Sequence, residues 1–168
     1  ANVSYIVNRF KETKEEDLNK EDATAMIGFL DESIKQVEDE FLNNFKTVGS
    51  TIEEQAKKTK RTSLLYNQTF ISLCKAGTLQ ATNQALSMLQ KEKERLNKLQ
   101  REATFFTSAS YDTDLSALAI VESKLIRQRG LLLEKDRYEK SKENIEKMKE
   151  TLKEKPKPKP TPPPETVK

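Results

Sequence analysis

The residues that most often carry catalysis are scarce in this sequence. Histidine is absent, which removes the commonest general base and metal ligand at neutral pH and the Ser/His and Cys/His nucleophile systems. The single cysteine, Cys74, cannot build a zinc cluster or an internal disulfide, and beside Leu73 in a helical pattern it is expected to be a small core residue. The four glycines form no phosphate-binding loop. We therefore expect no enzyme, no metal and no cofactor.

Acidic residues are plentiful, but their pattern does not suit acid–base chemistry. The residues Asp31, Glu32, Glu38, Asp39 and Glu40 fall on the polar side of a helical pattern. A carboxylate pair acts as acid and base only inside a cleft that shifts one of the two pKa values. We interpret these residues as solvated helix surface.

A basic cluster is the first candidate binding site. It places Lys57, Lys58, Lys60 and Arg61 within five positions. On a helix these side chains wrap around the axis and do not line one face. They could contact phosphates or acidic lipid headgroups, or they could form a solvated belt on the helix.

The second candidate binding site lies in the C-terminal segment, which contains all six prolines of the chain. Such a composition forbids a helix and favours an extended polyproline conformation. The order Lys157, Pro160, Pro163 fits the basic-x-x-Pro-x-x-Pro register that grooves of the SH3 type bind. The alternative is a spacer or tether, which is the commoner role of such tails.

The element that must position these residues is a long apolar stripe with steps of three and four, the spacing of one helix face. We predict that this stripe is a seam for partner helices, formed by Ile27, Leu30, Ile34, Val37, Phe41, Phe45, Val48, Ile52, Tyr66, Phe70 and Leu73. No proline interrupts it, so we expect one helix over about residues 24–76. Gly49, followed by Ser50 and Glu53 at the spacing of a capping box, offers an alternative stop and restart.

Two more helices are expected after this one. Gly77 can take a left-handed cap and Thr78 can begin a new helix, so we place a turn there and a second helix over about 79–106. The small polar segment 107–114 is predicted to be a linker before a third helix over 115–152.

The ends of these helices carry further expectations. Asp22 or Thr24 is predicted to cap the first helix, and Asp112 or Asp114 the third. The apolar pattern of the third helix thins after Leu133, so we expect its last twenty residues to project from the bundle or to pair weakly with another chain.

Composition agrees with an elongated all-α fold. Only 35% of the residues are hydrophobic and 34% are charged, which suits long helices sharing a thin core. We predict an elongated, coiled-coil-like three-helix bundle over 22–153. It follows an N-terminal docking or capping segment, 1–21, and precedes a disordered proline-rich tail, 154–168.

The expected function is a non-catalytic helical scaffold or adaptor subunit that binds other helical proteins or itself, with an SH3-like domain as a possible partner of the tail. The alternative is a peripheral membrane-binding or curvature-sensing module that uses the basic cluster on an anionic surface. A third interpretation is a surface or secreted adhesin with a proline-rich stalk. The formal net charge of +3 is too small and dispersed to indicate specific nucleic-acid binding. For the location of the protein, we favour the cytoplasm.

Overall fold

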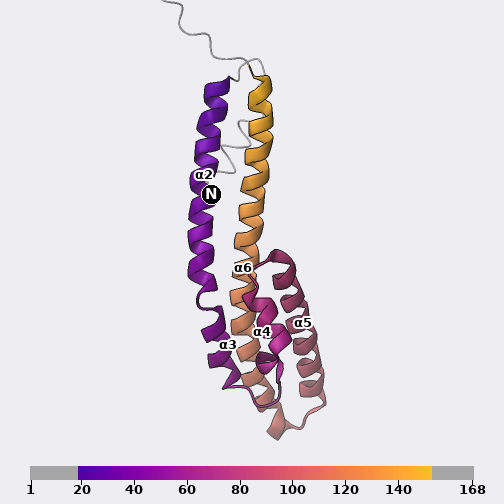
Figure 1. Ribbon diagram of the computed structural model, residues 1–168. Coiled ribbons are helices and arrows are strands. Elements are labelled where there is room, and N and C mark those ends of the chain that lie inside the picture. The colour runs from indigo at the N-terminus through magenta and orange to yellow at the C-terminus, as the bar shows by residue number, and fades with distance from the viewer. Residues whose placement is uncertain (1–18, 153–168) are drawn as a thin grey trace, which may run out of the picture. The chain divides into compact units, whose positions relative to one another are not determined.

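The computed structural model describes residues 19–152, and within this range every regular element is a helix (Figure 1). The elements are α2 (Lys20–Phe45), α3 (Val48–Ala56), the 3-10 helix η2 (Leu64–Tyr66), α4 (Gln68–Lys75), α5 (Leu79–Glu102) and α6 (Phe105–Thr151). The predicted all-α class is therefore confirmed for the described range. The N-terminal segment 1–18 and the tail with Lys157, Pro160 and Pro163 lie outside the described residues.

The chain forms two compact units. Within the described range, unit 1 consists of residues 19–36 and 136–152, and unit 2 consists of Val37–Lys135. Helices α2 and α6 each contribute residues to both units.

Helix α2 begins one turn earlier than expected. The side-chain oxygen of Asn19 accepts a hydrogen bond of 3.0 Å from the backbone N–H of Asp22, so Asn19 caps the helix. The predicted caps, Asp22 and Thr24, are wrong because both lie inside the helix. Glu21 and Asp22 occupy the first turn, where negative charge favours the helix dipole.

The predicted continuous helix over 24–76 is wrong. It is interrupted first at Lys46 and Thr47, where the Thr47 hydroxyl donates to the backbone oxygen of Asn44 at 3.0 Å. A threonine that bonds to the preceding turn competes with the helical hydrogen bonds. The chain passes Gly49 within α3, leaves helical geometry again after Ala56, and resumes through η2 and α4. A stop and restart of the helix therefore exists near the alternative position, but it lies at Thr47, two residues before Gly49.

The turn predicted at Gly77 and Thr78 is confirmed. Gly77 has a φ angle of 73°, the left-handed conformation that favours glycine. The Thr78 hydroxyl accepts a hydrogen bond of 3.1 Å from the backbone N–H of Ala81 and so caps α5. The second predicted helix therefore begins where expected and ends four residues earlier, at Glu102.

The predicted linker over 107–114 is wrong, because α6 already begins at Phe105 and continues for 47 residues. The backbone oxygen of Thr104 accepts hydrogen bonds from the N–H groups of Thr107 and Ser108, which start the first turn. Neither Asp112 nor Asp114 is a cap, since both lie within α6. Tertiary contacts of this segment outweigh its weak local helix preference.

Unit 1 is held together by a small core between α2 and the end of α6. Its buried residues are Ala23, Met26, Leu30, Ile145 and Leu152. The expectation that the last twenty helical residues project or pair with another chain is wrong, because their apolar positions pack on α2 within the same chain.

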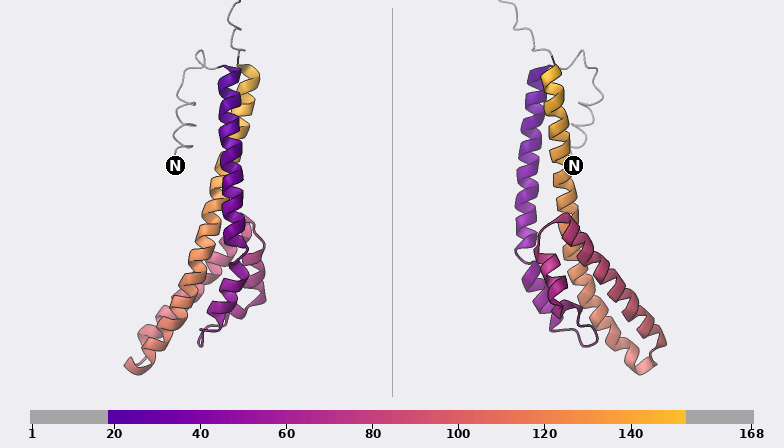
Figure 2. Two further views of the ribbon diagram at one scale, coloured as in Figure 1. Left: turned by 90° about the vertical axis from the view of Figure 1, so that its left-hand side faces the viewer. Right: turned by 45° about the vertical axis from the view of Figure 1, so that its right-hand side comes forward.

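Unit 2 contains the larger core, to which all of its helices from α3 to α6 contribute. Its fully buried members include Val48, Ile52, Leu65, Phe70, Cys74, Leu89, Leu96, Leu118 and Leu125. Figure 2 shows α3, α4 and α5 gathered around the N-terminal part of α6. The prediction that Cys74 is a small core residue is confirmed.

Candidate functional site

The predicted partner seam is largely internal to the chain. Leu30, Val37, Val48, Ile52 and Phe70 are buried, each with at most 4% of its surface exposed. At these positions the prediction of a surface for partner helices is wrong, because the chain's own helices cover them. The remaining positions are partly buried apart from Tyr66, which is 59% exposed.

The basic cluster Lys57, Lys58, Lys60 and Arg61 lies in the loop between α3 and η2, where sequence analysis placed it on a helix. All four residues are exposed. Within residues 19–152, none of the three lysines forms an ion pair with a carboxylate. Their positive charges are thus available to a ligand.

The buried carboxylate of Asp114 holds this loop in place. It accepts hydrogen bonds from the backbone N–H groups of Lys60 at 3.0 Å, Arg61 at 2.6 Å and Thr62 at 2.8 Å. Asp114 has no exposed surface, and hydrogen bonds to a charged acceptor offset the cost of burying it. The loop backbone therefore directs these N–H groups inward, while the lysine side chains stay exposed.

The side chain of Arg61 is a second attachment of the loop to α6. Its guanidinium lies 4.2 Å from the centre of the Tyr111 ring, and its Nε donates to the Ser110 hydroxyl at 2.6 Å. Stacking and hydrogen bonding together fix a planar guanidinium better than either does alone.

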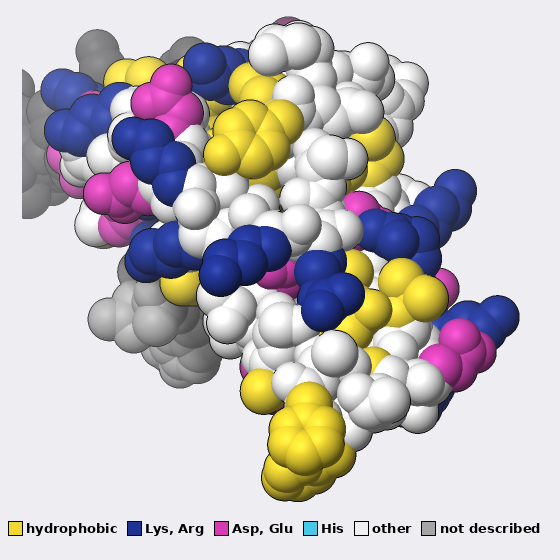
Figure 3. Space-filling model, turned by 90° about the horizontal axis from the view of Figure 1, so that it is seen from below, with side chains coloured by type: hydrophobic (Ala, Val, Ile, Leu, Met, Phe, Trp, Pro, Cys, Tyr) yellow, Lys and Arg dark blue, Asp and Glu magenta, His cyan; other side chains and the backbone are white. Residues whose placement is uncertain are grey.

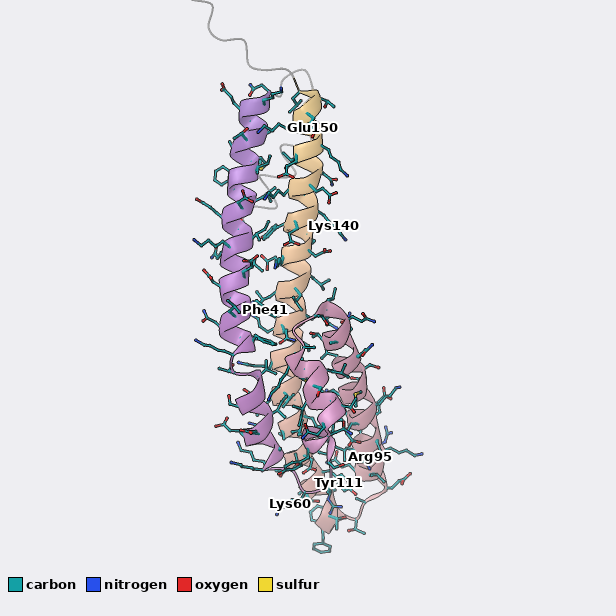
Figure 4. The ribbon with its side chains drawn as sticks, in the orientation of Figure 1. Phe41, Lys60, Arg95, Tyr111, Lys140 and Glu150 are labelled. Atoms are coloured by element: carbon teal, nitrogen blue, oxygen red, sulfur yellow. The ribbon has the colours of Figure 1, made fainter. Side chains whose placement is uncertain are left out.

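A third attachment joins the loop to α5. The Thr62 hydroxyl donates to a carboxylate oxygen of Glu92 at 2.5 Å, and the other oxygen accepts from the Nε of Arg95. The hydrogen bonds from Arg95 and Thr62 hold the pKa of Glu92 below its ordinary value, although burial opposes this shift. Figure 4 shows Lys60, Arg95 and Tyr111 near the same end of unit 2.

Two exposed phenylalanines lie at this end, where α5 turns into α6. Phe105 is 89% exposed and Phe106 is 91% exposed, and their rings pack edge to face with centroids 5.8 Å apart. Ser110, which binds Arg61, is roughly 8 Å further along the axis of α6. Seen from this end, hydrophobic side chains protrude beside a band of lysines and arginines (Figure 3).

Sequence analysis missed this aromatic pair. Both residues fell at the end of the predicted second helix, over about 79–106, and neither was singled out. The available signal was the adjacent pair itself, placed between polar residues where two helices meet.

An open groove of about 430 Å³ lies between α3, η2 and α4. Its apolar lining includes Ile52, Leu65 and Ile71, and Lys57 and Lys75 also line it. No carboxylate pair or thiol lines it, so it offers space for an apolar side chain rather than for chemistry.

The outer face of α6 in unit 2 carries an exposed stripe. The stripe consists of Ala119, Ser123, Ile126, Gly130 and Leu133, which follow one another in steps of four and three and are all exposed. Ile126 is 45% exposed and Leu133 is 42% exposed. At Gly130 no atom apart from the adjoining residues and backbone of α6 lies within 4 Å of the position that a Cβ would occupy, so the backbone is accessible.

Ion pairs border the stripe on both sides. Glu122 accepts from Lys93 of α5 at 2.9 Å, and Arg127 donates to Glu40 of α2 at 3.3 Å. All of these residues belong to unit 2. The result is a strip of small and apolar residues with charged margins, an arrangement suited to a helix–helix contact.

In the described part of the chain, no three His, Cys, Asp or Glu residues gather in a group that could hold a metal ion. None of the helices between residues 19 and 152 combines the length and the apolar character needed to cross a membrane. A comparison with known protein families, with curated proteins and with solved structures finds no match for this chain. The described residues define an all-helical, bundle-like protein.

Proposed function

We propose that this chain is a non-catalytic helical scaffold that associates with another helix through the α6 stripe, and that the partner is a second copy of the chain. The observation that carries the proposal is the stripe itself, because a helix face with apolar residues at steps of four and three is suited to packing on another helix. The absence of histidine from the sequence supports the non-catalytic part.

The order of side-chain sizes in the stripe supports a second copy as the partner. Small and large residues alternate along it, in the order Ser123, Ile126, Gly130, Leu133. When two such stripes pack antiparallel, the large residues of one can enter the gaps over the small residues of the other. A symmetric dimer needs one surface that is complementary to itself in this way.

Sedimentation equilibrium over a range of protein concentrations tests the proposal. We expect the wild-type protein to approach twice the chain mass of 19.3 kDa and the variant Leu133→Lys to remain a monomer. Leu42→Lys is the matched control, because Leu42 is also an exposed helical leucine of unit 2 but lies outside the stripe.

Two results would contradict the proposal. The first is a wild-type protein that stays monomeric at every concentration. The second is a dimer that persists in Leu133→Lys and Ile126→Lys, which would place the contact on another surface.

A further inference from the structure

We propose that the end of unit 2 formed by Phe105, Phe106 and the basic loop 57–61 attaches the protein to an anionic lipid surface. This surface does not overlap the α6 stripe, so the inference goes beyond the proposed dimer and does not depend on it. The aromatic pair and the basic loop are both needed, and each contributes by a different physical mechanism.

The aromatic pair supplies the apolar contact. Phe105 and Phe106 expose about nine-tenths of their surface to water, which is unfavourable for large apolar rings. They are the first two residues of α6, directly after the turn from α5, so they can enter the boundary between headgroups and acyl chains without any change in the rest of the helix. The depth of such an insertion is limited to the first turn of α6, because Ser108, Ser110 and Asp112 follow on the same helix.

The basic loop supplies the electrostatic attraction. Segment 57–61 contains four basic residues and no acidic one, and its three lysines form no ion pair within residues 19–152. Clusters of this kind are attracted to anionic headgroups over a distance set by ionic strength. The bonds from Asp114 to the loop backbone hold the cluster at the end where the rings protrude, so the two contacts can form together.

A lipid surface suits this end better than a folded protein partner does. Neither Phe105 nor Phe106 lines the groove between α3, η2 and α4, and both rings are exposed over most of their surface. A protein partner would need a pocket shaped to fit both rings, whereas a fluid bilayer adapts to any protruding apolar group. The positive charge beside the rings complements anionic lipid headgroups.

The experiment uses the full chain and vesicles of phosphatidylcholine and phosphatidylserine, roughly three to one, with pure phosphatidylcholine vesicles as the uncharged comparison. Because the sequence contains no tryptophan, Phe106→Trp introduces a single tryptophan at the proposed insertion site, which can be excited selectively over the four tyrosines. We expect its emission to shift to shorter wavelength with the anionic vesicles and to be quenched by brominated acyl chains. Phe29→Trp, at an exposed phenylalanine of unit 1, should show neither effect.

Co-sedimentation with the same vesicles measures the two contributions separately. We expect the double variant Phe105→Ser, Phe106→Ser to bind the anionic vesicles at least about tenfold more weakly than the wild type. Phe29→Ser should bind as the wild type does. The triple variant Lys57→Gln, Lys58→Gln, Lys60→Gln should lose at least as much affinity. Salt of about 1 M, which shortens the Debye length to about 3 Å, should weaken wild-type binding strongly.

Several outcomes would overturn the inference. One is a wild-type protein that binds neither kind of vesicle. Another is binding that either the phenylalanine substitutions or the lysine substitutions leave unchanged. A third is a loss of self-association in the double phenylalanine variant without vesicles, which would make the pair a protein contact. The variant Leu133→Lys should still bind vesicles, so failure of the dimer and failure of membrane attachment are distinguishable.

Discussion

The carboxylate of Asp114 accepts a hydrogen bond of 2.6 Å from the backbone N–H of Arg61, a residue 53 positions earlier in the chain. The same carboxylate also binds the N–H groups of Lys60 and Thr62. One buried side chain of α6 thus fixes the backbone of the loop that carries the basic cluster. The position of these charges therefore depends on this contact as well as on the contacts of the Arg61 and Thr62 side chains.

Replacement of Asp114 is therefore expected to release the loop. Asp114→Ala leaves three backbone N–H groups without their acceptor, and we expect unit 2 to lose about 2 to 4 kcal/mol of unfolding free energy. Asp114→Asn keeps one acceptor oxygen and should lose less. Denaturant unfolding measures the free energy, and hydrogen exchange at Lys60, Arg61 and Thr62 reports the loop. Unchanged exchange in Asp114→Ala would show that the loop is held by other contacts.

The contact between Glu92 and Thr62 predicts a dependence of stability on acid. Hydrogen bonds from Arg95 and Thr62 lower the pKa of Glu92 in the folded protein below the ordinary value of 4.5. A lowered folded-state pKa adds stability at pH values above 4.5, and this stability is lost as the pH falls through the folded-state pKa.

We expect Glu92→Gln to reduce the difference in unfolding free energy between pH 7 and pH 3, measured by urea titration. Glu94→Gln, at an exposed neighbour on the same helix, is the control and should leave the difference almost unchanged. An equal effect of both substitutions would mean that the pH dependence comes from general charge and not from this contact.

Local residue patterns predicted the helical class and the turn at Gly77 and Thr78, because these features depend on spacing and backbone preference. The interruption at Thr47 was not predictable from the apolar pattern, since Phe45 and Val48 keep the phase of the stripe across it. The apolar pattern does not reveal that the Thr47 hydroxyl donates a hydrogen bond to the preceding helical turn.

The candidate site was predicted only in part. The basic cluster was recognised from composition, but its place in a loop depends on Asp114, which local rules favoured as a helix cap. The same rules predicted that 107–114 is a linker, because local sequence does not show that Tyr111 and Asp114 are buried against the basic loop. The exposure of Phe105 and Phe106 depends on tertiary structure. Hydrophobicity alone would have predicted that both side chains are buried.

Gly77 is expected to resist substitution. A side chain there must adopt a φ angle of 73°, and its Cβ would lie 3.3 Å from the ring of Phe45, which is tighter than an ordinary contact. We expect Gly77→Ala to reduce the unfolding free energy by about 1 to 2 kcal/mol. Gly28→Ala, inside α2 with open space around it, should instead raise stability by about 0.5 to 1 kcal/mol. Thermal unfolding of the two variants compares these signs directly.

The core of unit 1 predicts a large loss of stability when Ile145 is truncated, although the sequence pattern predicted that this part of α6 projects from the bundle. Ile145 is fully buried among Ala23, Met26 and Leu30. We expect Ile145→Ala to reduce the stability of unit 1 by about 2 to 4 kcal/mol and to speed hydrogen exchange in the first turns of α2. Ile120→Ala, at an exposed isoleucine of α6, should change stability by less than about 1 kcal/mol. Similar effects at both sites would mean that the end of α6 does not pack on α2.

The buried thiol of Cys74 gives a probe of unit 2 that needs no engineered label. Burial raises the pKa of Cys74 to about 12 from its ordinary value of 9.0, so the reactive thiolate is scarce in the folded protein. We expect a disulfide reagent at pH 8 to react with the folded chain far more slowly than with the chain in denaturant. Rapid reaction under native conditions would show that α4 opens readily.

The same shift predicts that alkaline pH destabilises the protein through this group. A raised folded-state pKa favours the protonated thiol, so the stability that it contributes is complete below pH 9.0 and is lost as the pH rises toward about 12. Between these values the loss should reach about 1.4 kcal/mol per pH unit. Cys74→Ala removes the group, and its unfolding free energy should fall less steeply above pH 9.0 than that of the wild type. Equal slopes would mean that the thiol ionises without unfolding of its surroundings.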